Sequence, residues 1–320
     1  MFAIATGGIV WLLLQGSSTG LTPLTDFKPG QTYKGEDGGL YGKYSNVPPS
    51  AHRSAALSES SRIVPRGADG QPSSTGRIVL ISIGMSNTTQ EFSVFRQRAN
   101  ADPEKSERVI IVDCAQGGMT AADWGRTDSV RPRSTNPWKV MLQRLETAGV
   151  TPLQVQAAWV KLAQRNPASL GEFPLHARSL RDDTVLVLNQ LKQHCPNLRI
   201  AYLSSRIYAG YATTPLNPEP YAYESAFAMR WLILDQIVGD PALNWNPTAG
   251  AVRSPLLLWG PYLWADGVKG RAIDSLVWLR GDFANDGTHP STSGREKVAS
   301  LLLHFFKTDV TTRPWFVRNP

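Results

Sequence analysis

The sequence has little cysteine and no obvious set of metal ligands. Its 320 residues include two cysteines, Cys114 and Cys195, which can build neither a disulfide framework nor a four-cysteine zinc site. Most of the histidines lack the spacing of a metal site, and we interpret them as structural. These are His52, His176, His194 and His304. We therefore predict neither a metal nor another cofactor.

Charged residues are also scarce, at 18% of the chain, and the basic ones form no run of five or more. The sequence shows neither a zinc-finger pattern nor an RNA-recognition motif, so we predict no nucleic-acid partner. The 33 basic residues nevertheless exceed the 26 acidic ones, which gives a net charge of +7. Scattered positive charge usually belongs to a solvated surface, but it also suits an anionic cell wall or an acidic polysaccharide.

The apolar run at the N-terminus is short for a membrane span. Phe2 to Leu14 form 13 apolar residues, which suits the hydrophobic region of a signal peptide. No lysine or arginine precedes Lys28, so the usual basic segment is missing. A buried strand or helix is the alternative. We predict a possible signal peptide over 1–18, a secreted or periplasmic protein, and no stable membrane insertion of the mature chain.

The rest of the chain divides by composition. Residues 19–75 are rich in Gly, Pro and Ser and predict an ordered extension with one helix, whereas 76–310 predict an α/β domain and 311–320 a tail. Short apolar runs alternate with helical patterns in the domain, which indicates a parallel five-stranded sheet. The predicted strands are Ile78–Ile83, Val109–Val112, Val155–Val160, Ile200–Ser204 and Pro255–Trp259.

Ligands of an open parallel sheet bind at the carboxyl ends of its strands. Ser86 lies in the segment Gly84–Thr88 at the end of the first predicted strand, and Asp286 and His289 lie just before the last predicted helix. A serine at a strand-to-helix turn can expose its hydroxyl, a histidine can act as its base, and an aspartate can orient that histidine. A lone serine there is usually a helix cap, and a lone Asp-x-x-His is usually a turn. Together, in this order, they predict a nucleophilic site.

Three segments resemble the SGNH (GDSL-like) hydrolases, and most of all their carbohydrate O-acetylesterase branch. The segments are Gly84–Asn87, Asp113–Thr120 and Asp286–His289. The resemblance covers about Arg77 to Phe306 and implies a three-layer α/β/α flavodoxin-like sandwich, with insertions over the active edge.

The resemblance also implies roles for single residues. Ser86, His289 and Asp286 would hydrolyse an ester, the backbone amides of Ser86 and Gly118 would hold the oxyanion, and Asn87 would contact the substrate.

The third family segment, which carries an oxyanion asparagine, is missing. Trp159, Val160 and Lys161 stand in its place. Lys161 is expected to supply the third oxyanion donor, or else to be a surface or salt-bridged lysine. Trp159 is a candidate for stacking on a sugar or for the core.

Arg206 follows the fourth predicted strand and should face the cleft. It can bind a substrate carboxylate or pair with Glu219 or Glu224. The two cysteines should remain free, because they fall at opposite ends of a parallel sheet, at least about 17 Å apart, and a disulfide needs Cα atoms within about 7 Å. A nucleophilic Cys114 is a remote alternative.

The sequence therefore predicts a secreted serine esterase that removes acetyl or other short acyl groups from carbohydrate. A lipase, thioesterase or polyester hydrolase with the same triad is one alternative. An inactive glycan-binding domain of the same fold is another, motivated by the missing asparagine.

Overall fold

The computed structural model describes residues 17–126 and 136–318 of the chain. The apolar segment Phe2 to Leu14 lies outside the described residues. Within the part that is described, no helix combines the length and the apolar character needed to cross a membrane.

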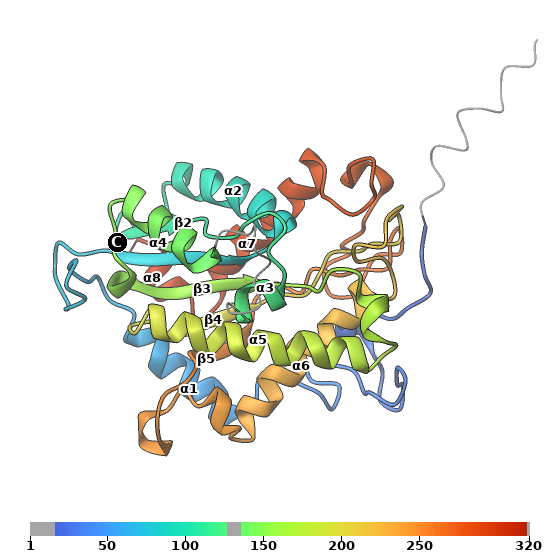
Figure 1. The fold of residues 1–320 in the computed structure, drawn as a ribbon, viewed down its shortest axis with the longest axis horizontal. Helices are drawn as coiled ribbons and strands as arrows, with labels where there is room; N and C mark the ends of the chain where they lie inside the picture. The colour runs from blue at the N-terminus through green and yellow to red at the C-terminus, as the bar shows by residue number, and fades with distance from the viewer. Residues whose placement is uncertain (1–16, 127–135, 319–320) are drawn as a thin grey trace, which may run out of the picture.

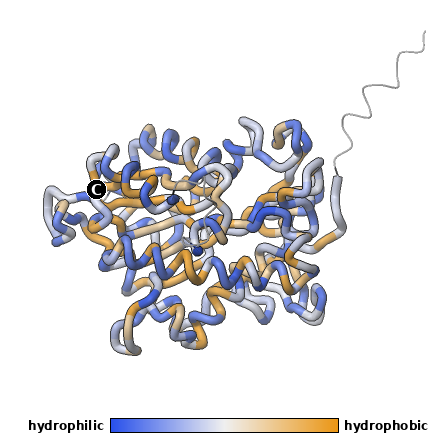
Figure 2. Tube along the Cα trace, in the orientation of Figure 1, coloured by the Kyte–Doolittle hydropathy of each residue, from blue (hydrophilic) through white to orange (hydrophobic). Residues whose placement is uncertain are grey.

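The centre of the protein is a five-stranded, all-parallel sheet, as predicted. Its order is β2-β1-β3-β4-β5, which is the order of flavodoxin-like folds. The strands are almost entirely buried, which explains their continuous apolar, β-branched sequences. Their bounds are β1 (Ile78–Gly84), β2 (Val109–Val112), β3 (Val155–Lys161), β4 (Ile200–Leu203) and β5 (Leu256–Trp259). Hydrophobic residues accordingly concentrate in the middle of the molecule (Figure 2).

Helices cover both faces of the sheet and complete the three layers (Figure 1). One layer contains α1 (Ser50–Ser61), α2 (Ser86–Ala101), α7 (Thr292–Thr308) and α8 (Arg313–Phe316), which contact one another in the pairs α2–α7, α7–α8 and α1–α8. The other contains α3 (Ala121–Gly125), α4 (Pro137–Thr147), α5 (Leu175–His194) and α6 (Tyr221–Ile237), linked by α3–α4, α3–α5 and α5–α6 contacts. The segments that follow the strands therefore meet at one edge of the sheet.

Residues 17–75 lie against this core and contribute α1. Asp266 accepts hydrogen bonds from the backbone amides of Thr19 and Gly20 at 2.6 and 2.9 Å, and Tyr223 donates to the carbonyl of Thr22 at 2.9 Å. These long-range bonds tie the start of the described chain to α6 and to the loop that follows β5.

Candidate active site

Ser86 lies at the first position of α2, two residues after the end of β1. The intervening turn is tight at Gly84. A Cβ atom there would lie 2.3 Å from the Thr88 hydroxyl and 2.4 Å from the Lys161 carbonyl oxygen, so no larger residue fits without movement. The Gly84 carbonyl accepts the Gln116 amide at 3.0 Å. This packing fixes where α2 begins and hence where the Ser86 hydroxyl points.

The loop before α7 brings His289 and Asp286 to Ser86. The Ser86 Oγ lies 2.8 Å from His289 Nε2, and His289 Nδ1 lies 2.5 Å from Asp286 Oδ2. An ionised carboxylate only accepts, so Nδ1 carries the proton and Nε2 is free to accept from Ser86. Asn87 donates from Nδ2 to the Thr288 carbonyl at 2.9 Å, which ties α2 to this loop. Residues 200 positions apart thus form one continuous hydrogen-bonded chain.

Asp286 is held in its charged form. Burial alone would raise the pKa of this carboxyl, but hydrogen bonds from the His289 ring and from the backbone amides of His289 and Thr288 outweigh it and lower the pKa from 3.8. Both amides donate to Oδ1 at 3.0 Å, which leaves Oδ2 for the imidazole. The aspartate can therefore orient His289 and stabilise its protonated form.

Two backbone amides beside Ser86 have no acceptor within the described chain, those of Ser86 itself and of Gly118. Gly118 has φ +79°, in the left-handed region that favours glycine. Its carbonyl accepts from Arg165 Nη2 at 2.8 Å. A Cβ on the neighbouring Gly117 would lie 4.0 Å from that of Ser86, so this loop passes next to the hydroxyl.

Of the two roles expected for Lys161, the structure contradicts the oxyanion donor and confirms a salt-bridged lysine. Its side chain is 1% exposed and donates to both carboxylate oxygens of Glu91, which is 0% exposed. Burial lowers the pKa of Lys161 to about 8, against the opposing effect of Glu91. Lys161 belongs to the end of β3 itself and points toward α2, so its ammonium is an internal counter-ion and does not face the substrate.

Of the two roles considered for Trp159, the structure contradicts stacking on substrate and confirms a position in the core. Trp159 is fully buried, stacks on Phe92 at 5.7 Å between ring centroids and donates to Ser204 Oγ at 2.9 Å. Cys114 is buried and free, as is Cys195, which confirms the two free thiols. Burial raises the pKa of the Cys114 thiol well above its usual value, which excludes it as a ready nucleophile.

A cavity of about 440 Å³ opens on Ser86 and His289. Arg206 and Asn87 line it, as the sequence predicts, although the Asn87 amide is engaged with Thr288. Several other residues that were not predicted to contact substrate also line it, among them Arg165, Leu216, Asn217 and Thr288. No motif marks Leu216 and Asn217, because they reach the site from the long loop between β4 and α6.

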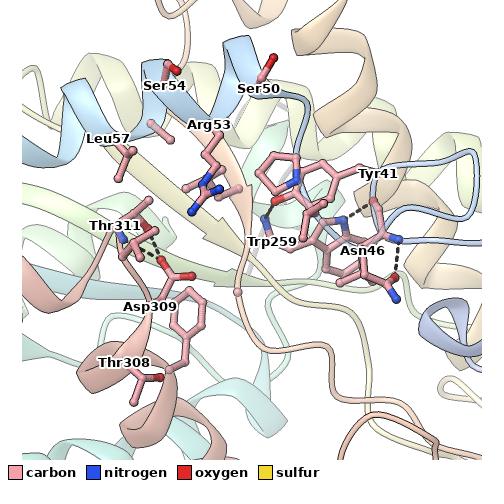
Figure 3. Close-up of a pocket in the computed structure, with 18 residues that line it drawn as sticks. Tyr41, Asn46, Ser50, Arg53, Ser54, Leu57, Trp259, Thr308, Asp309 and Thr311 are labelled. Carbon is pink, nitrogen blue, oxygen red and sulfur yellow. Dashed lines mark hydrogen bonds between the residues drawn. The ribbon is translucent and has the colours of Figure 1, made fainter.

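A larger cavity, of about 800 Å³, lies between α1, the end of β5 and the end of α7 (Figure 3). Some of its polar groups bind one another: Trp259 Nε1 donates to the Leu40 carbonyl at 2.6 Å, and Asp309 accepts from Thr311 Oγ1 at 2.6 Å. The lining holds no serine–histidine pair. Size alone therefore does not locate the chemistry.

Among the described residues, no group of three or more acidic, cysteine or histidine side chains is placed to hold a metal ion. The cavity presents side chains and backbone amides of the chain itself. These provide a hydroxyl, an imidazole supported by a carboxylate, and two free N–H donors.

No protein-family model matches this chain, and no curated protein matches it. Among solved structures, a candidate acylhydrolase from Bacteroides fragilis NCTC 9343 aligns at 13% identity over 81% of this chain and 96% of its own, with a TM-score of 0.39. The extracellular lipase of Streptomyces rimosus aligns at 10% identity over 71% of this chain and 99% of its own, with a TM-score of 0.35. Similarity this low establishes neither a family nor an activity, so we infer function from the residues of the site.

Proposed function

We propose that the protein is a serine ester hydrolase with Ser86 as nucleophile, His289 as general base and acid, and Asp286 as the group that orients His289. One observation carries the proposal. Ser86 contacts His289 at 2.8 Å, His289 contacts Asp286 at 2.5 Å, and Ser86 and His289 line a cavity. Acyl transfer requires this order of contacts and a His289 ring that carries its proton on Nδ1.

The reaction proceeds in two balanced steps. Ser86 Oγ attacks the ester carbonyl carbon while its proton passes to His289 Nε2, and that proton then goes to the alcohol oxygen as the ester C–O bond breaks. Water next attacks the acyl-serine and gives a proton to His289, which returns it to Ser86 Oγ as the acid leaves. The amides of Ser86 and Gly118 donate to the oxyanion of each tetrahedral intermediate.

The preferred substrate in this proposal is an acetyl or other short acyl ester of a carbohydrate. The resemblance of the Ser86 and His289 segments to carbohydrate O-acetylesterases supports this choice. A cavity of about 440 Å³ also suits a sugar unit with a short acyl group. The apolar stretch from Phe2 to Leu14 supports a protein exported from the cytoplasm. A lipase or thioesterase with the same triad is the alternative. The preference for short or long acyl chains distinguishes the two.

The test is a rate comparison between 4-nitrophenyl esters of increasing acyl length and acetylated xylan and pectin. We expect hydrolysis of acetyl esters, a decline with acyl length, and complete loss in Ser86→Ala. The matched control is Ser93→Ala, since Ser93 lies two turns along α2 and its hydroxyl donates to the Thr89 carbonyl, away from the cavity. A rate that increases toward long chains would favour the lipase alternative, and activity retained in Ser86→Ala would refute the nucleophile.

A further inference from the structure

Arg206 is a buried cation in the candidate active site. It follows β4, is 4% exposed and lines the same cavity as Ser86 and His289. Its Nε has no hydrogen-bond partner, and its guanidinium donates no hydrogen bond to any other group of the described chain. Burial lowers the pKa of Arg206 from its usual value. Because a buried N–H group without a partner is costly, an acceptor that reaches Arg206 from the cavity would be favoured.

Neither carboxylate that the sequence suggested as a partner is paired with Arg206. Glu219 accepts from the Ala209 amide at 2.8 Å, the Tyr223 amide at 2.9 Å and the Trp264 indole at 2.8 Å. Glu224 binds a different set of groups, which includes Lys34. The prediction of a structural ion pair is therefore wrong for both residues.

The carboxylates near the cavity floor are occupied as well. Glu91 is bound by Lys161, and Asp286 by His289. None of the salt bridges of the described chain includes Arg206. No carboxylate therefore competes directly with an incoming ligand for its guanidinium.

The rest of the cavity lining carries positive charge of the same kind. Arg165 forms no salt bridge within the described chain, and its Nη2 donates only to the Gly118 carbonyl, a neutral acceptor. No aspartate or glutamate is among the residues that line this cavity. Glu91, Glu219 and Asp286 act on Arg206 from a distance, but no salt bridge of the described chain engages either guanidinium. An ester that enters the site therefore meets two guanidinium groups that no acidic side chain binds directly, in a chain of net charge +7.

We infer that Arg206, assisted by Arg165, forms a carboxylate-binding subsite, so that the enzyme hydrolyses esters whose substrate carries a carboxylate close to the scissile bond. A guanidinium binds a carboxylate through two parallel hydrogen bonds, which fixes the orientation of the ester relative to Ser86. This inference rests on the proposed esterase function. The carboxylate belongs either to the acyl group or to the alcohol, as in an acetylated uronic acid.

The test compares matched neutral and anionic esters. The acyl arm uses mono-4-nitrophenyl adipate against 4-nitrophenyl hexanoate, and the alcohol arm uses 4-acetoxybenzoate against 4-acetoxybenzamide. We expect kcat/KM about 10- to 100-fold higher for the anionic member of one arm, the size of a hydrogen bond to a charged group. Arg206→Met should lower kcat/KM for the anionic member more than for the neutral member and so abolish that preference. Arg53→Met is the control, because it removes an equal charge from the other cavity.

A binding measurement separates this inference from the proposed function. Calorimetry measures the affinity of wild type and Arg206→Met for 4-hydroxybenzoate and 4-hydroxybenzamide, and so tests the subsite without catalysis. Anion-selective binding that Arg206→Met loses supports the subsite even where no ester is hydrolysed. Hydrolysis without anionic preference in either arm overturns the inference and leaves the esterase standing. Equal loss on neutral and anionic esters also overturns it, because Arg206 would then act on the ester group itself. If Arg206→Met does not fold, the comparison of anionic and neutral esters is repeated with Arg165→Met, because Arg165 is partly exposed.

Discussion

Replacing Lys161 by methionine should reduce stability and leave catalysis intact. The substitution keeps most of the side-chain volume but removes the only cation that binds Glu91 directly in the described structure. Glu91 is 0% exposed, so the change leaves a buried carboxyl without its counter-ion. The position therefore distinguishes an internal ion pair from an oxyanion donor.

The expected loss is about 3–5 kcal/mol in the free energy of unfolding, the usual effect of removing one member of a buried pair. At about 2–4 °C per kcal/mol for domains of this class, the melting temperature should fall by roughly 6–20 °C. Glu91 can limit the loss by binding a proton, because burial raises its pKa. Its folded pKa then lies above the ordinary value of 4.5, so the stabilisation from this proton declines as the pH rises, and the variant should be less stable at pH 8 than at pH 5.

Thermal and urea unfolding of four proteins measure this effect: wild type, Lys161→Met, Glu91→Leu and the double variant. The double variant should recover most of the stability, because replacing a whole buried pair by apolar groups is often neutral or favourable. Kinetics at a temperature where all four are folded should give kcat within about threefold of wild type. A normal melting temperature with kcat reduced 10²- to 10³-fold, the effect of losing an oxyanion donor, would refute this account.

Two further substitutions test the geometry around the nucleophile. Asp286→Asn should lower kcat by about 10³- to 10⁴-fold, since the amide favours the wrong tautomer of His289. The stability that the ionised carboxylate provides is present above its unfolded pKa of 3.8 and is lost as the pH falls through its lower folded value. The difference in melting temperature from wild type should therefore be constant between pH 5 and 7 and shrink below pH 4, and a constant difference at all pH values would contradict it. Gly84→Ala should destabilise the protein by about 1–3 kcal/mol and reduce kcat, because its Cβ would overlap Thr88 and the β3 backbone; unchanged kinetics would show that this turn does not position Ser86.

The sheet could be predicted because its strands are short apolar runs rich in β-branched residues. Observed and predicted strands differ by at most one residue at either end. The approach of Ser86 to His289 follows from the same topology, since both lie at the carboxyl edge of a parallel sheet.

The errors at Trp159 and Lys161 have one physical cause. The predicted strand ends at Val160, which would leave the next side chain to face the cleft, whereas β3 continues through Lys161. Side chains two positions apart in a strand share a face, so Lys161 points to the same side as Trp159, toward α2. There Trp159 stacks on Phe92 and Lys161 binds Glu91. An apolar pattern locates a strand but does not give its last residue.

The contributions of Arg165 and Asn217 could not be predicted, for a different reason. Each comes from a loop whose path depends on tertiary contacts: the Asn166 amide donates to the Leu216 carbonyl at 3.1 Å and joins the two loops beside the cavity. The unpaired state of Arg206 was equally hidden, because it depends on Glu219 being satisfied by Trp264 and two backbone amides. Such pairings cannot be predicted from composition or motif spacing.

The most direct test of the central claim is the site of reaction with a fluorophosphonate probe. The wild-type protein is incubated with the probe, digested and mapped by mass spectrometry, with Ser86→Ala and His289→Ala treated in parallel. We predict one modified residue, Ser86, with no labelling in Ser86→Ala and strongly slowed labelling in His289→Ala. Labelling of a different residue, or an unmodified wild-type protein that still hydrolyses esters, would contradict the assignment of Ser86 as the nucleophile.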